Sequence, residues 1–435
     1  MADRAHYSTA SRVALVIGIL LALAECWHLT HRVASRQTDF SVFYRSAQEL
    51  VGGVDAEFYR RLDQTGLYHC IPPSGTMLLF WMPWTSMQVA AALWSLLNLA
   101  VLALSVWALH AVFAGLDRQR RLYQSTWLWA VFLLLVMSSG SLQVGQYSVL
   151  FASCWIFYLW ADATNRHALA ALLLALPTTI KFYPGLLFAI PATLRRFRQL
   201  ACLLPAIILL AVILPLPLYG SHLSEMWHGF FTHIIFGDAN RVQAGLRPES
   251  LSNQSLDVVL LRYLTFQPIF HQANPWFPHA SLPQTLVALI SNLLKLGALV
   301  LTAIASVRLS TQALRRPRWT ALLLMALWTA TLYLVMLEVR ARYAVYPFPA
   351  FLPLLVMAAA QRHNLKRYVG WCTFIALTVA AVLQFAPDSV RMLGPSVIAI
   401  VAVWAVLLRC AWLSHTRFLG PANTIAAETT EVHTA

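Results

Sequence analysis

Four charged side chains could do chemistry in a chain that is otherwise strongly apolar. Asp39 follows the first hydrophobic segment closely, in the run TDFSVFY at 38–44. Lys181 lies between two short apolar segments, and Arg340 and Arg342 share a short turn between two others. An ionised carboxylate accepts a proton from a hydroxyl group, and cations stabilise a phosphate group. We therefore treat Asp39 as a candidate base and the three cations as candidate phosphate ligands.

The composition identifies the class of protein that must position these residues. Hydrophobic residues make up 59% of the 435-residue chain and charged residues 11%, whereas soluble domains carry about 25% charged residues. The chain therefore reads as a helical membrane protein. It contains no zinc-ligand spacing, Walker loop, Rossmann glycine pattern or Asp-x-Asp pair, so we expect no metal and no other cofactor. The formal net charge is +14, but the basic residues are scattered over short turns. This distribution argues against a nucleic-acid-binding surface.

The hydropathy pattern predicts an all-α polytopic fold, since a helix needs about 20 apolar residues to cross a bilayer. Twelve transmembrane helices are predicted: 12–29, an uncleaved anchor, and then 86–113, 124–139, 148–161, 167–180, 185–194, 199–218, 282–307, 320–337, 343–360, 368–386 and 394–412. The short pair on either side of Lys181 could instead fuse into one helix, which would leave eleven.

The distribution of basic residues favours twelve spans over eleven. With twelve, most arginines and the tail 414–435 fall on one side of the membrane, which the positive-inside rule identifies as cytoplasmic. Fusing the short pair would invert every later loop. The outer side then carries two long loops, a catalytic loop at 30–75 and a larger aromatic-rich loop at 219–281. We therefore predict a single integral membrane domain, 1–435, whose chemistry is extracytoplasmic.

Apolar residues in the first outer loop recur at helical spacing. This pattern predicts an amphipathic helix in the membrane interface, and Val54–Leu62 is expected to form a second, shorter one. The apolar positions of the first helix are Phe40, Phe43, Tyr44, Ala47, Leu50 and Val51. Asp39 lies in its first turn, where the helix dipole favours the ionised carboxylate. The alternative is that Asp39 serves only as a helix cap.

Further polar residues at membrane depth have two interpretations each. The amide of Gln146 could bind sugar hydroxyls or cap a helix, and Lys181 could bind a lipid phosphate or extend to the interface. Arg340 and Arg342 could clamp a phosphate or pair with Glu338. Lys295, near the middle of a predicted span, could line a cavity or pair with a buried carboxylate such as Glu25.

Five short motifs follow one another along the chain: Asp39-Phe40 with Tyr44, Pro72-Pro73, Gly145-Gln146-Tyr147, Ile180-Lys181-Phe182-Tyr183-Pro184 and Asn253-Gln254-Ser255-Leu256. Their order resembles that in glycosyltransferase family 87, and the resemblance runs from about residue 12 to residue 360. The family usually has Asn after Gly-Gln, where this chain has Tyr147. The resemblance implies a C-type glycosyltransferase fold, with Asp39 as the catalytic base and a polyprenyl-phosphate-hexose donor, most often mannose.

These observations together predict an inverting hexosyltransferase of the plasma membrane. A lipid phosphate is already a good leaving group, so one base and several cations suffice, unlike the two carboxylates of an inverting glycosidase. The acceptor would be a glycolipid or another glycan. The expected substrate-binding residues are Tyr44, Gln146, Lys181, Tyr183, Asn253, Gln254, Arg340 and Arg342. The alternative is a multi-span transporter or lipid-linked sugar flippase, although no internal repeat is evident.

Overall fold

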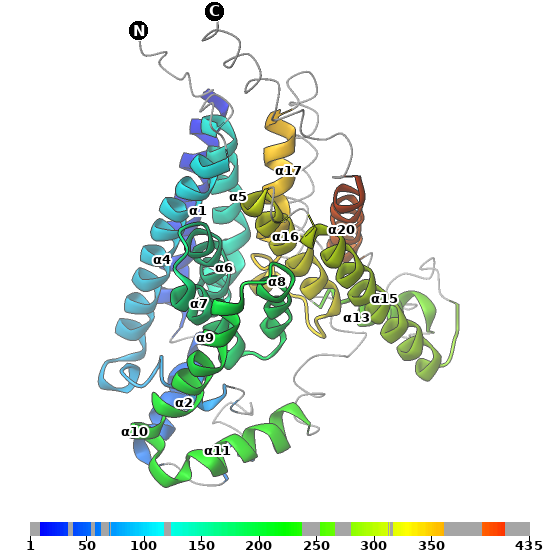
Figure 1. Cartoon of the computed structure of the whole chain (residues 1–435). Coiled ribbons are helices and arrows are strands. Elements are labelled where there is room, and N and C mark those ends of the chain that lie inside the picture. Colours follow the sequence, from blue (N-terminus) through cyan, green and yellow to red (C-terminus); the bar gives the residue numbers. More distant parts are fainter. Residues whose placement is uncertain are drawn as a thin grey trace, which may run out of the picture.

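The computed structural model describes most of the chain as a bundle of helices (Figure 1). The described residues are 9–33, 38–53, 57–61, 69, 71–116, 123–236, 253–265, 280–311, 313, 316–360 and 394–413. Within these ranges there is no β-strand, which confirms the predicted all-α class.

Seven described segments are long and apolar enough to cross a membrane. Six of them lie within single helices, and the seventh runs from Phe197 to Ile235. The six helices are α1 (Thr9–Arg32), α4 (Met87–Leu116), α5 (Tyr123–Val144), α15 (Gln284–Ser310), α16 (Pro317–Val335) and α20 (Pro395–Leu413). Shorter apolar helices are α6 (Ser148–Ala163), α7 (His167–Ile180) and α17 (Phe348–Ala360). The predicted span 368–386 and the tail 414–435 lie outside the described residues. The count of twelve and the C-type fold therefore stay predictions.

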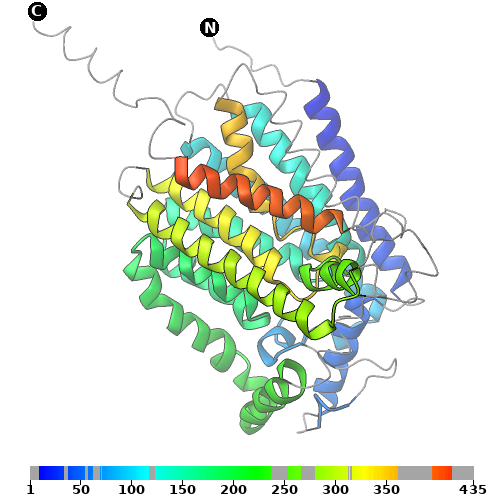
Figure 2. The same ribbon diagram turned by 90° about the vertical axis from the view of Figure 1, so that its right-hand side faces the viewer.

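The helices form two packed groups that share α6, α16 and α17 as a common centre. On one side α1 packs against α4 and α5, while α7 packs against α6 and α9 (Phe197–Ile208). On the other side α16 packs against α15, α17 and α20. Helices α15, α16 and α20 run side by side in Figure 2. The side chains of α16 are almost entirely buried, whereas α15 exposes a broad apolar face. A helix that is apolar all round belongs in the interior, and an exposed apolar face suits contact with lipid.

The segment after Lys181 traverses the bundle without forming a regular long helix. It consists of a 3-10 helix, η2 (Tyr183–Phe188), and the five-residue α8 (Ala189–Thr193), so the predicted span 185–194 is not a single α-helix. Pro184 and Pro191 lack the backbone N–H groups that a regular helix needs there.

An ion pair shows where this segment ends. Arg196 pairs with Asp162 in the last turn of α6, with 3.0 Å from Nε to Oδ1. Since α6 and α7 are successive antiparallel helices, Lys181 and Arg196 lie at opposite ends of the bundle.

The helix predicted in the first loop is α2 (Asp39–Gly52), which lies at the end of the bundle opposite the start of α1 (Figure 1). Its apolar face is buried against the protein, and the hydroxyl of Tyr44 donates to the carbonyl of Thr85 at 2.7 Å. Val51 is the exception among the predicted apolar positions, because it is exposed. The described part of Val54–Leu62, residues 57–61, is a hydrogen-bonded turn and not a helix.

Short helices complete this end of the bundle. They are α3 (Pro73–Thr76), η1 (Met82–Trp84), α10 (Leu216–Tyr219), η4 (Gly220–His222), α11 (Leu223–Gly229), the π-helix η5 (Phe230–Ile235), α13 (Leu256–Leu264) and η6 (Ala341–Tyr343). The π-helix η3 (Leu209–Ile213) continues α9 toward the same end.

Lys295 is a buried cation on α15, and its partner is not Glu25. Its Nζ forms an ion pair with Asp257 of α13, and the hydroxyl of Ser291 donates to the same carboxylate at 2.6 Å. The side chains of Lys295 and Asp257 are 10% and 16% exposed. A charge buried at this depth is stable only when paired, so this pair fixes α13 against α15.

Candidate active site

Asp39 occupies the first turn of α2, as the sequence predicts, but it is not the residue that caps the helix. Thr38 is the cap: its hydroxyl accepts a bond from the Ser41 amide at 3.2 Å, and the Ser41 hydroxyl accepts one from the Thr38 amide at 3.0 Å. This reciprocal capping box satisfies the free amides at the helix start. The Asp39 carboxylate is therefore available for other contacts, and it is 20% exposed.

The turn at Gly145 places Gln146 beside this carboxylate. The Gln146 amide donates from Nε2 to Oδ2 of Asp39 at 3.1 Å, and its Oε1 accepts from the Tyr147 amide at 3.0 Å. Gly145 has a φ of +71°, and a Cβ there would lie 2.6 Å from the Cβ of Phe40. Only glycine adopts this conformation without strain and lets α2 come so close. The Gly-Gln pair thus brings the α5–α6 turn against the start of α2.

Arg342 makes the strongest contact with Asp39. Its Nη1 donates to both carboxylate oxygens, at 2.5 and 2.7 Å, while its Nη2 donates to Oε1 of Glu338 at 2.9 Å. The arginine thus bridges two carboxylates. Burial alone would lower the pKa of Arg342, but Asp39, Tyr343 and Glu338 raise it well above its ordinary value. The guanidinium therefore stays charged and forms an ion pair with Asp39.

Lys181 reaches the same cluster from the other side of Tyr343. Its Nζ donates to the Tyr343 hydroxyl at 3.1 Å and lies 4.5 Å from the centre of that ring. The Tyr343 hydroxyl in turn donates to Oε2 of Glu338 at 3.3 Å. No carboxylate in the described part of the chain lies within 4.0 Å of the Lys181 ammonium. Its charge is therefore not directly compensated.

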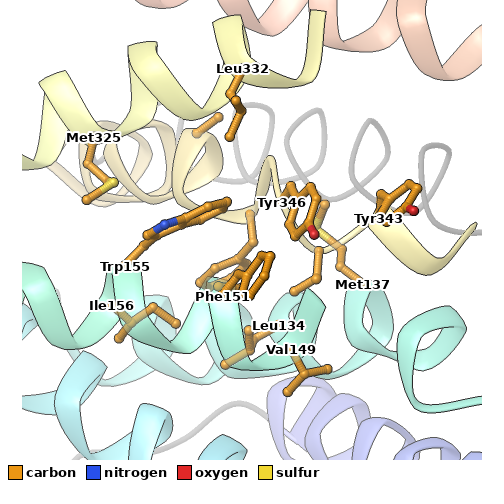
Figure 3. Close-up of a cluster of buried hydrophobic side chains, with 14 of the residues drawn as sticks. Leu134, Met137, Val149, Phe151, Trp155, Ile156, Met325, Leu332, Tyr343 and Tyr346 are labelled. Atoms are coloured by element: carbon orange, nitrogen blue, oxygen red, sulfur yellow. The ribbon is translucent and has the colours of Figure 1, made fainter. Parts of the chain in front are cut away.

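Two further tyrosines, the half-buried Tyr183 and the buried Tyr346, pack beside the Tyr343 ring that contacts Lys181. The Tyr183 hydroxyl donates to that of Tyr346 at 3.0 Å, and the ring of Tyr346 stacks on that of Tyr343 with centroids 5.5 Å apart. Figure 3 shows Tyr343 and Tyr346 at the edge of a cluster that contains Phe151 and Trp155 of α6. Tyr183 therefore positions Tyr346, which in turn supports the Tyr343 ring that contacts Lys181.

The assembled cluster carries more positive than negative charge. Arg340 pairs with Glu338, 2.7 Å from Nε to Oε1, and its side chain is 28% exposed. Among the described residues, Lys181, Arg340 and Arg342 face two carboxylates, Asp39 and Glu338. The Nε of Arg342 is buried and has no hydrogen-bond partner in the same part of the chain. The arrangement combines a carboxylate that can accept a proton with an excess cation and free donors for an anion.

Residues 70–277 match the family model described as Glycosyltransferase family 87. This segment carries Gln146, Lys181, Tyr183, Asn253 and Gln254 in the predicted order. The match covers just under half of the 435-residue chain. It confirms the resemblance inferred from the motifs and supports a glycosyltransferase activity. No curated protein and no solved structure matches the chain.

Asn253 and Gln254 bond to the backbone beside the charged cluster and hold that segment in place. Oδ1 of Asn253 accepts from the amides of Ser255 and Val339, both at 3.0 Å, and the Gln254 amide donates to the Val339 carbonyl at 2.7 Å. Both side chains are fully buried. These bonds fix the chain beside Glu338 and favour a positioning role over the predicted contact with a sugar hydroxyl.

The structure therefore divides the predicted site residues into two groups. Lys181, Gln146, Arg340 and Arg342 gather with Asp39, and Tyr183 supports them. Tyr44, Asn253 and Gln254 instead bond to the backbone of neighbouring segments. Among the described residues, no group of three or more His, Cys, Asp or Glu side chains could hold a metal ion.

Two members of the cluster were absent from the predicted site. Glu338 entered the sequence analysis only as an ion-pair partner, and Tyr343 only as the first residue of the predicted span 343–360. Their spacing was a usable signal, because Glu338, Arg340, Arg342 and Tyr343 fall within six consecutive positions of an apolar region. Ionisable residues between membrane segments cost free energy and therefore mark functional sites.

Proposed function

We propose that this protein is an inverting glycosyltransferase that moves a hexose, with mannose as the first candidate, from a polyprenyl-phosphate donor to a glycolipid or glycan acceptor. The observation that carries the proposal is the juxtaposition of Asp39 with Arg342, Arg340 and Lys181. A carboxylate and several cations at one site match the two requirements of the reaction, which are a proton acceptor and compensation of phosphate charge.

The roles follow from the contacts. Asp39 takes the proton of the acceptor hydroxyl as the oxygen attacks the anomeric carbon. The bond between that carbon and the phosphate oxygen breaks on the opposite face, so the anomeric configuration inverts. Lys181 and Arg340 bind the phosphate, since both have donors without partners in the described residues. Gln146 orients Asp39.

The proposed location is the plasma membrane, with the active site on the extracytoplasmic side. The motifs gather at one end of the bundle, and the Asp162–Arg196 pair lies at the other. The basic turns Arg195–Arg198 and Arg166 belong to that second end, which the positive-inside rule assigns to the cytoplasm. A cysteine placed at position 39 should therefore react with a membrane-impermeant thiol reagent added from outside. Labelling only after the membrane is opened would contradict this orientation.

The test of the activity uses purified protein, radiolabelled polyprenyl-phosphate-mannose and a lipid extract as the acceptor source. We expect transfer of label to a new lipid or glycan product. Asp39→Asn, which keeps the shape of the side chain, should abolish transfer while yield and melting temperature are retained. Substantial activity of this variant would remove the base assignment. Movement of intact donor across vesicle membranes without transfer would favour the flippase alternative.

A further inference from the structure

Helix α3 begins within the Pro72-Pro73 motif, to which the proposed function assigns no role. It has four residues, all of them buried. Isolated helices of this length are not stable, so the surrounding protein must hold α3 in place. A Cβ atom at Gly75 would lie 2.5 Å from Cγ2 of Ile71 and 3.4 Å from Cγ2 of Ile180. The helix is therefore packed tightly, and its polar groups bond to the end of α7, to the turn between α5 and α6, and to α10.

The first of these bonds supports Lys181. The Ser74 hydroxyl donates to the carbonyl of Thr179 at 2.5 Å, in the last turn of α7. The last carbonyls of a helix have no partner within it, so this bond satisfies one of them. Lys181 follows two positions later and caps the helix, its amide donating to the carbonyl of Pro177 at 2.9 Å. Ser74 therefore fixes the backbone from which the Lys181 side chain reaches Tyr343.

The second bond supports Gln146. The Tyr147 hydroxyl donates to the Gly75 carbonyl at 3.0 Å, and the Tyr147 amide donates to Oε1 of Gln146 at 3.0 Å. The Tyr147 ring is buried, with its centroid 4.9 Å from that of Phe43 on α2. This one tyrosine therefore connects α3 to the amide that contacts Asp39.

The third bond involves a different part of the molecule. The hydroxyls of Thr76 and Tyr219 share a hydrogen bond. Tyr219 packs with Leu50, Leu223 and Met226 in a hydrophobic cluster separate from the main core. Helix α3 thus carries two side-chain hydroxyls, one bonded beside Lys181 and one bonded to α10, and they can be removed one at a time.

We propose that α3 sets the distance between the phosphate site and the base. Ser74 is a positioning residue for Lys181, and Tyr147 acts in the same way on Gln146. The inference rests on the proposed functions of Lys181 and Asp39. The acceptor oxygen attacks the anomeric carbon on one face while the phosphate leaves on the other, so base and phosphate ligand must be held a fixed distance apart. A displacement of about 1 Å in such a site can lower the rate about a hundredfold.

The experiment measures kcat and KM with polyprenyl-phosphate-mannose as donor. Ser74→Ala should raise KM for donor by about twofold to tenfold, as expected for the loss of one hydrogen bond, and leave kcat nearly unchanged. Ser74→Thr keeps the hydroxyl and should retain most of the affinity. Tyr147→Phe should lower kcat by about twofold to tenfold and leave KM for donor nearly unchanged, because its contacts lead to the base.

Thr76→Val is the matched control, since it removes the other hydroxyl of the same helix. It should lower the melting temperature and change neither kinetic constant. A change in KM equal to that of Ser74→Ala would overturn the proposal, because loss of α3 packing would then explain both variants.

Double variants identify the residue through which each effect is exerted. In the Lys181→Met background, Ser74→Ala should raise KM no further, since the side chain that it positions is gone. In the Gln146→Ala background, Tyr147→Phe should lower kcat no further. Additive effects in either background would overturn the proposal. If Ser74→Ala fails to fold, Ser74→Cys, which keeps the size of the side chain but donates weakly, takes its place.

Failure of the proposed function has a separate signature. An unchanged donor KM in Lys181→Met, or an active Asp39→Asn variant, would contradict the proposed roles of those residues whatever the Ser74 variants do. A raised KM in Lys181→Met together with wild-type kinetics in Ser74→Ala and Tyr147→Phe would overturn only the positioning role of α3.

Discussion

Arg342 and Asp39 lie 303 positions apart in the sequence, and a single guanidinium nitrogen of Arg342 donates to both carboxylate oxygens of Asp39. The contact exists only when the first loop, the turn at Gly145 and the turn at Glu338 are all in place. The site is therefore sensitive to substitutions that touch no substrate, and the predictions below separate such positioning effects from direct binding.

Removing the ammonium of Lys181 should weaken donor binding more than it slows the chemical step. A hydrogen bond to a charged group contributes about 1.5–3 kcal/mol, so Lys181→Met should raise KM for donor by roughly tenfold to a hundredfold. Lys181→Arg should retain part of the affinity. Steady-state kinetics with varied donor measures both. Arg198→Met, at an exposed cation on the opposite end of the bundle, is the control. An unchanged KM in Lys181→Met would remove this residue from the phosphate site.

Gly145→Ala should reduce both stability and activity. The added methyl group would meet the Cβ of Phe40 at 2.6 Å in a backbone conformation with φ of +71°, and such strain costs of order 1–3 kcal/mol. Relief of the clash moves α2, and with it Asp39. We expect a lower melting temperature and a kcat reduced by about tenfold or more, since small displacements of a base are costly. Gly297→Ala, where a Cβ would meet nothing within 4 Å, should change neither. Wild-type kcat in Gly145→Ala would show that this close approach does not position the base.

Asn253→Ala should destabilise the protein and disturb the charged cluster without contacting it. The substitution leaves the buried amides of Ser255 and Val339 without their acceptor, at about 1–3 kcal/mol each. Asn253→Asp keeps an acceptor in the same place and should retain more stability. Thermal unfolding in detergent, followed alongside transfer activity, distinguishes the two variants. If both variants unfolded like wild type but had a raised acceptor KM, Asn253 would instead be a sugar contact, as the sequence predicted.

The Lys295–Asp257 pair should show opposite behaviour in single and double variants. Lys295→Met leaves Asp257 buried and unpaired, which costs about 3–5 kcal/mol, whereas replacing both charges by apolar residues is often neutral. We therefore expect a lower melting temperature for Lys295→Met and recovery in Lys295→Met combined with Asp257→Leu. Failure of the double variant to recover would mean that the charges themselves are required. The Ser291 hydroxyl loses its acceptor in the double variant, so Ser291→Ala belongs in the same background.

Much of this arrangement was predictable from the sequence, and the limits have physical causes. Apolar composition and helical spacing predicted the all-α class and α2, because both depend on local pattern. The order of motifs predicted the family. The prediction of one α-helix over 185–194 was wrong in helix type, because a 3-10 helix precedes the short α-helix there. Prolines and tertiary contacts decide the helix type, and an apolar run does not.

Contacts between residues far apart in the sequence could not be predicted either. Spacing alone could not show that Asn253 accepts a hydrogen bond from the Val339 amide. Nor could it show that Lys295 forms its ion pair with Asp257 and not with Glu25. Each of these choices depends on which segments become neighbours after folding. The cations and Asp39 were predictable as residue types, but their bridge through Glu338 was not.

The ion pair between Asp257 and Lys295 has a consequence for the biogenesis of the protein. A lysine at the centre of an isolated membrane helix costs about 2.5–3.5 kcal/mol on insertion scales. Asp257 is synthesised before Lys295, so its carboxylate is available when the helix bearing the lysine leaves the ribosome. We expect α15 to enter the bilayer together with the preceding segment, as a neutral unit, and to do so less efficiently when Asp257 is replaced.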